Sequence, residues 1–186
     1  MTTLGHVLLG LLARAPASGY DLAQKLKGPV DFFWQARHSQ IYPELARLEQ
    51  DGYVVVQHVP QTERPDKKIY RITDAGTTVL KAWVIAPVEV PVVRDELVLK
   101  AYCLWLAHPA AAIELFRAHA HHHTELLARY QRNQGWLLEQ WATEGRRIDS
   151  PWFGSIASIQ RGIGYEQEYA AWCRWMIEQL EQAISD

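Results

Sequence analysis

The stretch "SQIYPELARLEQDGY", residues 39–53, decides the fold because it predicts a helix with two unlike sides. At about 100° per residue, Ile41, Leu45 and Leu48 fall within one narrow arc and are expected to face a core. The opposite side, with its flanks, carries mainly polar and small residues: Ser39, Gln40, Tyr42, Pro43, Ala46, Arg47 and Gln50. The spacing therefore predicts an amphipathic helix with an exposed polar side.

Pro43 indicates where this helix begins. Proline is tolerated near a helix start because the first amide groups have no intrahelical partner. The helix origin is therefore expected near residues 38–40, with Ser39, Gln40 and Tyr42 at its exposed N-terminal end. A recognition helix enters the DNA major groove by this end, and its free amides favour phosphate. An ordinary amphipathic helix with a proline near its start remains an equal alternative when the segment is taken alone.

The flanking segments predict a small domain around this helix. Apolar spacing from Leu4 to Leu12 predicts one helix, and a second short helix begins near Ser18 or Gly19. Residues 53–59 and 69–72 are rich in β-branched and aromatic residues, which is typical of strands, and Thr73 can cap a further helix. Three helices followed by a hairpin is the order of a winged helix-turn-helix domain.

The predicted hairpin has a charged tip. Arg64, Lys67 and Lys68 place three cations within five residues, and Pro65 restricts the loop. A basic hairpin beside a recognition helix can contact the DNA backbone or the minor groove. The alternative is a solvated turn, because the tip also carries acidic residues, Glu63 and Asp66. The two features together, in this order, favour DNA binding.

Three segments resemble the PadR family of bacterial transcriptional regulators: "SGYDLAQKL" (18–26), "SQIYPELARLEQDGYV" (39–54) and "RPDKKIYRITDAGTTVLKAW" (64–83). The segment "RDELVLKAY" (94–102) is similar to the opening of that family's C-terminal helical region, and the chain length is similar to the longer-tailed branch. One departure is Glu63, where the family's wing is expected to carry glycine. The resemblance implies an N-terminal winged helix-turn-helix domain and a C-terminal helical domain.

The second half of the chain is predicted to be helical. Pro87 and Pro91 indicate a linker, which divides the chain into residues 1–86 and 87–186. Helices are expected over 94–107, 111–143 and 152–184. The last helix carries two apolar stripes: Ile156, Ile159, Ile163, Ala170, Cys173, Ile177, Leu180 and Ile184, and beside them Tyr165, Tyr169, Trp172 and Met176.

So wide an apolar arc predicts that one stripe packs on its own subunit and the other on a partner. The second half is therefore interpreted as a homodimerisation domain. A twofold pair of reading heads could then bind two half-sites about one helical turn apart. A helix buried wholly within one subunit is the alternative.

Two further patterns suggest ligands. Five of the eight tryptophans could line a pocket for a flat aromatic or cationic molecule, although core filling is the alternative: Trp83, Trp105, Trp136, Trp141 and Trp152. A small aromatic effector is implied mainly by the family resemblance. His119 and His123 lie one helical turn apart, but no carboxylate or cysteine completes a recognisable metal set. The histidines are interpreted as a solvated face, and no metal or cofactor is expected.

Composition excludes several classes of protein. Hydrophobic residues make up 48% and charged residues 22% of the 186, which is typical of a globular chain. Residues 1–85 carry a balance of +2 and the remainder −4. The apolar run from Val7 to Leu12 is too short to cross a membrane, and two distant cysteines fit a reducing cytoplasm. The sequence contains no phosphate-binding glycine loop or nucleophile elbow, so an enzyme with catalytic residues is not expected.

These observations lead to one principal interpretation and one rival. The chain is interpreted as a dimeric transcriptional regulator, a repressor, that binds a pseudo-palindromic operator in double-stranded DNA. The expected DNA-binding residues are Ser39, Gln40, Tyr42, Pro43, Arg47, Arg64, Lys67 and Lys68. The rival is a winged-helix protein-interaction module without specific DNA binding, which the modest chain charge of −2 permits.

Overall fold

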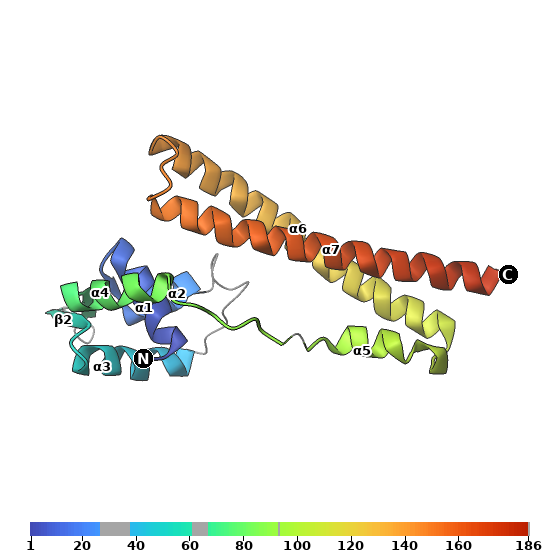
Figure 1. Ribbon diagram of the computed structural model, residues 1–186, viewed down its shortest axis with the longest axis horizontal. Helices are drawn as coiled ribbons and strands as arrows, with labels where there is room; N and C mark the ends of the chain where they lie inside the picture. The colour runs from blue at the N-terminus through green and yellow to red at the C-terminus, as the bar shows by residue number, and fades with distance from the viewer. Residues whose placement is uncertain (27–37, 61–66, 93, 186) are drawn as a thin grey trace. The chain divides into compact units, whose positions relative to one another are not determined.

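The computed structural model describes residues 1–26, 38–60, 67–92 and 94–185. The chain divides into two compact units, Met1–Glu89 and Val90–Asp186 (Figure 1). The boundary expected from Pro87 lies in the exposed segment that joins them. Each unit is described by itself below.

The described residues of the first unit form four helices and a small sheet. The helices are α1 (Thr3–Arg14), α2 (Gly19–Leu26), α3 (His38–Gln50) and α4 (Asp74–Val84). Threonine caps begin α1 and α4, because the side chains of Thr2 and Thr73 accept hydrogen bonds from amides three residues on. The expected cap at Thr73 is therefore confirmed.

The apolar side of α3 forms part of the core of this unit. Ile41, Leu45 and Leu48 are at most 1% exposed, so the arc predicted from their spacing is confirmed. They pack in one cluster with the buried leucines of α1 and α2, Leu4, Leu8, Leu9, Leu12, Leu22 and Leu26. Fully burying such a side chain contributes about 1.5–3 kcal/mol relative to leaving it in water. The rotation of α3 about its axis is thereby fixed.

The sheet has three antiparallel strands in the order β1-β3-β2: β1 (Ala17–Ser18), β2 (Val54–Val59) and β3 (Lys67–Ile72). The hairpin of β2 and β3 was expected, and we call it the wing. Strand β1 was not expected, because two residues after Pro16 are too few to show alternation. Lys67 and Lys68 pair with Val59 and His58, so they lie within β3 and not in the connecting loop.

Gly52 makes the turn from α3 into the wing. Its φ of +75° lies in the left-handed region, which favours glycine. The amide of Tyr53 bonds the carbonyl of Leu48, and the amide of Gly52 bonds that of Glu49. This is a Schellman motif, which satisfies the last carbonyls of α3 and directs the chain into β2.

The second unit is a helical hairpin with a short helix at one end (Figure 1). Its helices are α5 (Glu96–Tyr102), α6 (Pro109–Thr143) and α7 (Pro151–Ser185), with a 3₁₀ turn η1 (Leu104–Leu106). Contacts such as Arg117 with Glu181 and Gln134 with Gln160 show that α6 and α7 run antiparallel. The expected single helix over 94–107 is interrupted at Cys103, whose amide bonds the carbonyl of Lys100. Within the described parts of the chain, no helix is long and apolar enough to cross a membrane.

Candidate DNA-binding surface

The exposed face of α3 carries the residues expected to read DNA. Ser39, Gln40, Tyr42, Pro43 and Arg47 are all exposed, opposite the buried arc. The described helix begins at His38, within the range expected for its origin, and Pro43 is its sixth residue. Because proline has no N–H, it leaves the carbonyl of Ser39 without its usual partner from residue 43. The exposed face thus has hydroxyl and amide groups near its N-terminal end and the guanidinium of Arg47 in its last turn.

Tyr42 is positioned by the first residue of α2. A Cβ atom at Gly19 would lie 2.6 Å from Cε1 of the Tyr42 ring, so a side chain there would collide with the ring. Glycine therefore permits the ring to lie against α2 while 45% of the residue stays exposed. The sequence did not single out Gly19, because the requirement depends on a contact between helices.

Glu44 is a buried carboxylate of α3 that links this helix to the start of α1. It is 6% exposed, and its Oε1 accepts a hydrogen bond of 2.6 Å from the Thr2 hydroxyl at the start of α1. Its Oε2 lies 3.5 Å from the guanidinium of Arg47. The negative charge beside the α1 N-terminus is favourable to the helix dipole. Arg47, whose side chain is 58% exposed, is thus anchored at one end of the exposed face.

The wing brings two of the three predicted cations to this unit's surface. Lys68 is exposed, and Lys67 is partly exposed with its Nζ 3.2 Å from Oδ2 of Asp21 on α2. Hydrogen bonding from the Ser18 hydroxyl, followed by smaller effects of Ser18 N–H and Lys67, lowers the pKa of Asp21 against the effect of burial. Arg64, the third predicted cation, lies outside the described residues.

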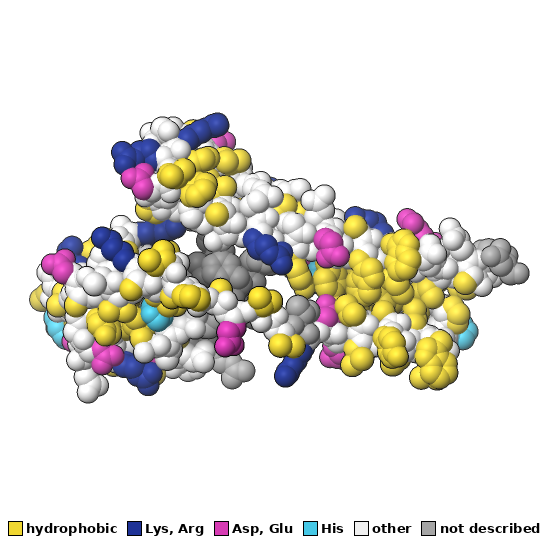
Figure 2. All heavy atoms as spheres, viewed as in Figure 1, with side chains coloured by type: hydrophobic (Ala, Val, Ile, Leu, Met, Phe, Trp, Pro, Cys, Tyr) yellow, Lys and Arg dark blue, Asp and Glu magenta, His cyan; other side chains and the backbone are white. Residues whose placement is uncertain are grey.

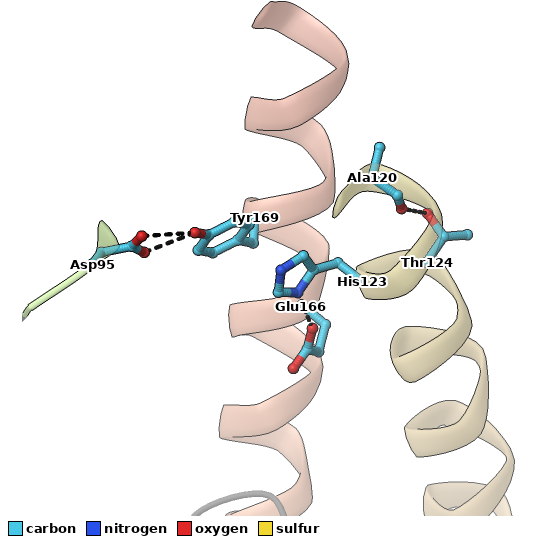
Figure 3. Close-up of polar contacts among 6 residues, drawn as sticks. All are labelled: Asp95, Ala120, His123, Thr124, Glu166 and Tyr169. Atoms are coloured by element: carbon cyan, nitrogen blue, oxygen red, sulfur yellow. Dashed lines mark hydrogen bonds and ion pairs between the residues drawn. The ribbon is translucent and has the colours of Figure 1, made fainter. Parts of the chain in front are cut away.

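The second unit contains a buried polar chain that the sequence analysis missed (Figure 3). Nδ1 of His123 on α6 lies 2.5 Å from Oε2 of Glu166 on α7, and both residues are buried. The His123 ring stacks on Tyr169 at 4.1 Å, and the Tyr169 hydroxyl donates to Asp95. Burial, and then the bond to Asp95, raises the pKa of Tyr169, which keeps its proton.

The histidine cluster is therefore not wholly a solvated face, as had been expected. His121 and His122 are exposed, but His123 is buried because the helical period turns it toward α7. Burial, and then the charges of His123 and His122, lowers the pKa of His119. Among the described residues, no three His, Cys, Asp or Glu side chains are grouped to hold a metal ion.

Both stripes of α7 contribute residues that are buried within this chain, and the predicted division of the stripes between two subunits stays a prediction. Ile159, Ile163, Ala170 and Cys173 of the first stripe and Tyr169 of the second are buried within this chain, chiefly because α6 runs along α7. Large apolar side chains are instead exposed at the other end of the unit, on α5 and η1: Leu99 at 62%, Tyr102 at 82%, Trp105 at 81% and Leu106 at 70%. Figure 2 shows hydrophobic side chains gathered over this end.

The tryptophans do not share one site within the second unit. Trp105 lies in η1, beside the start of α6. Trp136 and Trp152 pack edge to face at 5.5 Å near the turn between α6 and α7, and Trp141 packs on Phe153 there. The length of α6 separates these two places. Trp83, in the first unit, stacks on His6 at 4.5 Å.

Three helices, the third with an exposed polar side, followed by a β-hairpin are the arrangement of a winged helix-turn-helix unit. Comparison with known proteins supports this class for the first unit and matches the second unit to a separate domain. Residues 8–82 match the model of the transcriptional regulator PadR-like family, and residues 93–181 match that of the virulence activator alpha C-terminal domain. The chain belongs to the PadR-like family, whose members are DNA-binding regulators and not enzymes.

Relatives match along nearly the whole length. The negative transcriptional regulator PadR of Bacillus subtilis is 31% identical over 183 residues, which is 98% of this chain and 100% of the relative. The crystal structure of Bacillus subtilis PadR in complex with operator DNA has a TM-score of 0.82 at 30% identity, covering 96% and 98% of the two chains. Its complex with p-coumaric acid has a TM-score of 0.68 at 29% identity, covering 97% and 99%.

Proposed function

We propose that this chain is a cytoplasmic, dimeric repressor that binds a pseudo-palindromic operator through the exposed face of α3 and the wing. The observation that carries the proposal is the packing of α3. Its apolar side is fully buried, so Ser39, Gln40 and Tyr42 are held outward at one helix end. Such side chains can reach base edges in the major groove, and Lys68 can contact the neighbouring backbone.

The relatives support the same function. Bacillus subtilis PadR is a negative transcriptional regulator and was crystallised with operator DNA. The match to that DNA complex extends over both units of this chain. Repression by operator binding is therefore the function that geometry and relationship support together.

The test is binding to the promoter region upstream of the chain's own gene. Fluorescence anisotropy at 150 mM salt should give an affinity at least a thousandfold tighter than for a scrambled duplex, which is the lower range for specific DNA binders. The variant Gln40→Ala should lower this preference about tenfold, the loss expected for one base contact, whereas Lys81→Ala on α4 should keep it. Equal binding of the wild type to both duplexes would favour the rival protein-interaction module.

Dimerisation is proposed to use the exposed apolar end of the second unit. Leu99 and Tyr102 on α5, with Trp105 on η1, form a surface that a soluble chain rarely leaves in water. The partly buried Trp172 and Met176 on α7 pack on the core beneath α5. Sedimentation should show a dimer that Leu99→Glu converts to a monomer. Glu139→Lys, a charge change at an exposed α6 position, serves as control, and a dimer unaffected by Leu99→Glu would remove this surface from the proposal.

A small aromatic effector is proposed to release the operator. The proposal rests on the p-coumaric acid complex of Bacillus subtilis PadR. An effector can shift the equilibrium only by its differential affinity for the two states. Addition of p-coumaric acid to the protein–DNA complex should lower the anisotropy if this chain shares that ligand class. Unchanged DNA affinity at saturating ligand would exclude that compound as the effector.

A further inference from the structure

The first turn of α2 contacts both parts of the proposed reading surface. Gly19 lies under the ring of Tyr42 from α3, with the Cβ position 2.6 Å from Cε1. Two residues later, Oδ2 of Asp21 lies 3.2 Å from Nζ of Lys67 on the wing. The recognition helix and the wing are therefore both held by the same turn, residues 18–21.

Hydrogen bonds from Ser18 orient the carboxylate of Asp21 independently of Lys67. Its Oδ2 accepts hydrogen bonds from the Ser18 hydroxyl at 2.7 Å and from the Ser18 amide at 3.2 Å. The Ser18 hydroxyl in turn accepts from the amide of Asp21 at 3.2 Å. Ser18 is also paired with Ile69 of β3. An exposed ion pair usually contributes little because two flexible side chains must be ordered, but here one partner is already fixed.

The two wing lysines have different surroundings. Successive residues of a strand point to opposite faces, so Lys67 and Lys68 cannot both face α2. Lys67 turns to Asp21, whereas Lys68 is exposed opposite His58 on β2. Adjacent cations in the sequence thus have different opportunities to meet a phosphate.

We propose that Asp21 is a positioning residue for DNA reading, which acts by fixing Lys67 and with it the wing against the turn that supports Tyr42. Lys67 then holds the wing to α2 through its ion pair with Asp21, and Lys68 is the wing cation that contacts the DNA backbone. This inference rests on the proposed DNA binding and revises the expected role of Lys67. The opposite arrangement has Lys67 binding phosphate, with Asp21 as its competitor.

The two arrangements predict opposite effects in operator-binding titrations at several salt concentrations. Under our proposal, Asp21→Asn and Lys67→Met each weaken operator binding about fivefold, the size of a well-ordered ion pair, with an unchanged salt slope. The double variant is no weaker than either single variant. Lys68→Met lowers the slope by about 0.9, the value for one phosphate contact, and Lys81→Met changes nothing.

Tighter binding by Asp21→Asn would overturn the proposal, because removal of a competitor frees Lys67 for phosphate. A salt slope lowered as much by Lys67→Met as by Lys68→Met would overturn it as well.

A measurement on the free protein separates this proposal from DNA binding itself. Amide hydrogen exchange over β3 should become several-fold faster in Asp21→Asn and in Lys67→Met, because both release the wing strand. Lys68→Met should leave exchange as in the wild type. If the wild type fails to bind any operator, the proposed function falls, and exchange still decides whether Asp21 holds the wing. Unchanged exchange in both variants would contradict the claim that the ion pair of Asp21 and Lys67 holds the wing.

Discussion

The Tyr169 hydroxyl lies 2.9 and 2.8 Å from the two carboxylate oxygens of Asp95, and so ties α7 to the start of α5 (Figure 3). Oδ1 of Asp95 also accepts hydrogen bonds from the amides of Leu97 and Val98, at 2.9 and 3.1 Å. One carboxylate therefore caps α5 and anchors it to the long helix. Since α5 carries the proposed dimer surface, this contact controls how that surface is presented.

Tyr169→Phe should lower the free energy of unfolding by about 1.5 kcal/mol, the low end for a hydrogen bond to a charged group. Urea denaturation followed by circular dichroism measures the change. Tyr20→Phe, at a residue 61% exposed on α2, is the matched control and should change stability by less than about 0.5 kcal/mol. Equal effects of the two variants would show that the hydroxyl of Tyr169 contributes no anchoring.

Because His123 and Glu166 are a buried pair, the effects of replacing them on the free energy of unfolding should not be additive. His123→Leu leaves the carboxylate of Glu166, a residue 3% exposed, without its partner, and should cost about 3 kcal/mol. Adding Glu166→Met removes that uncompensated charge and should restore most of the loss. Urea denaturation of the single and double variants tests this. A double variant as unstable as the sum of its parts would mean that the two side chains act independently.

Cys173 should be inert to thiol reagents while the chain is folded. Burial, and secondarily the charge of Asp95, raises the pKa of its thiol from 9.0 to about 11. In Cys103→Ser protein at pH 8, a disulfide reagent should therefore react only after urea is added. Rapid labelling without urea would contradict the burial of Cys173 between α6 and α7.

The same raised pKa has a consequence for stability. The unfolded thiol ionises near its ordinary value of 9.0, whereas the folded thiol holds its proton up to about pH 11. Its contribution to stability is complete below about pH 9 and is lost as the pH rises to about 11. Unfolding curves over this range should show a smaller decline in Cys173→Ala than in the wild type, both in the Cys103→Ser background. Identical declines would exclude Cys173 as a contributor.

Tyr42→Ala should act on site preference more than on general affinity. A side chain at a base edge discriminates by about 1–3 kcal/mol, so the preference for operator over scrambled DNA should fall about tenfold. Binding to scrambled DNA should change less than twofold. Gly19→Ala, which displaces the ring without removing it, should lose preference in the same direction. Equal losses on both duplexes would place Tyr42 on the backbone instead of a base.

Sequence patterns were most informative where the spacing of residues within a single helix shows which side chains are buried or which residue caps it. The arc of Ile41, Leu45 and Leu48 could be read from helical spacing, and these residues are buried as expected. The cap at Thr73 could be predicted equally well, because it depends on residues three apart. The class of the first unit followed from such local signals in their order along the chain.

The features that escaped prediction depend on contacts between distant segments. Ser18 pairs with Ile69, fifty-one positions further on, and a two-residue strand has no periodicity of its own. The apolar residues of the strand begin at Ile69, so the sequence places Lys67 in the loop. In the structure, pairing with Val59 extends β3 back to Lys67. His123 was placed on a solvated face because only the position of Glu166 on α7 makes its burial favourable.

Asp21 offered a local signal that was not used. Serine followed three residues later by an acid, as in Ser18 and Asp21, indicates a capping box at the start of α2. Its second role, toward Lys67, required the register of β3. The exposed apolar residues on α5 and η1 were likewise not predicted as an interface. The apolar spacing of α7 is more regular, but many of its apolar residues are buried against α6 of the same chain.

The central claim is that the exposed face of α3 reads operator DNA, and the most direct measurement compares wild type with a variant altered only there. Ser39→Ala, Gln40→Ala and Tyr42→Ala combined leave the buried arc intact, so circular dichroism and the unfolding midpoint should be close to those of the wild type. Anisotropy at 150 mM salt should show the wild type preferring its promoter over scrambled DNA at least a thousandfold, and the combined variant less than tenfold. A folded combined variant that retains the full preference would show that sequence is read elsewhere on the chain.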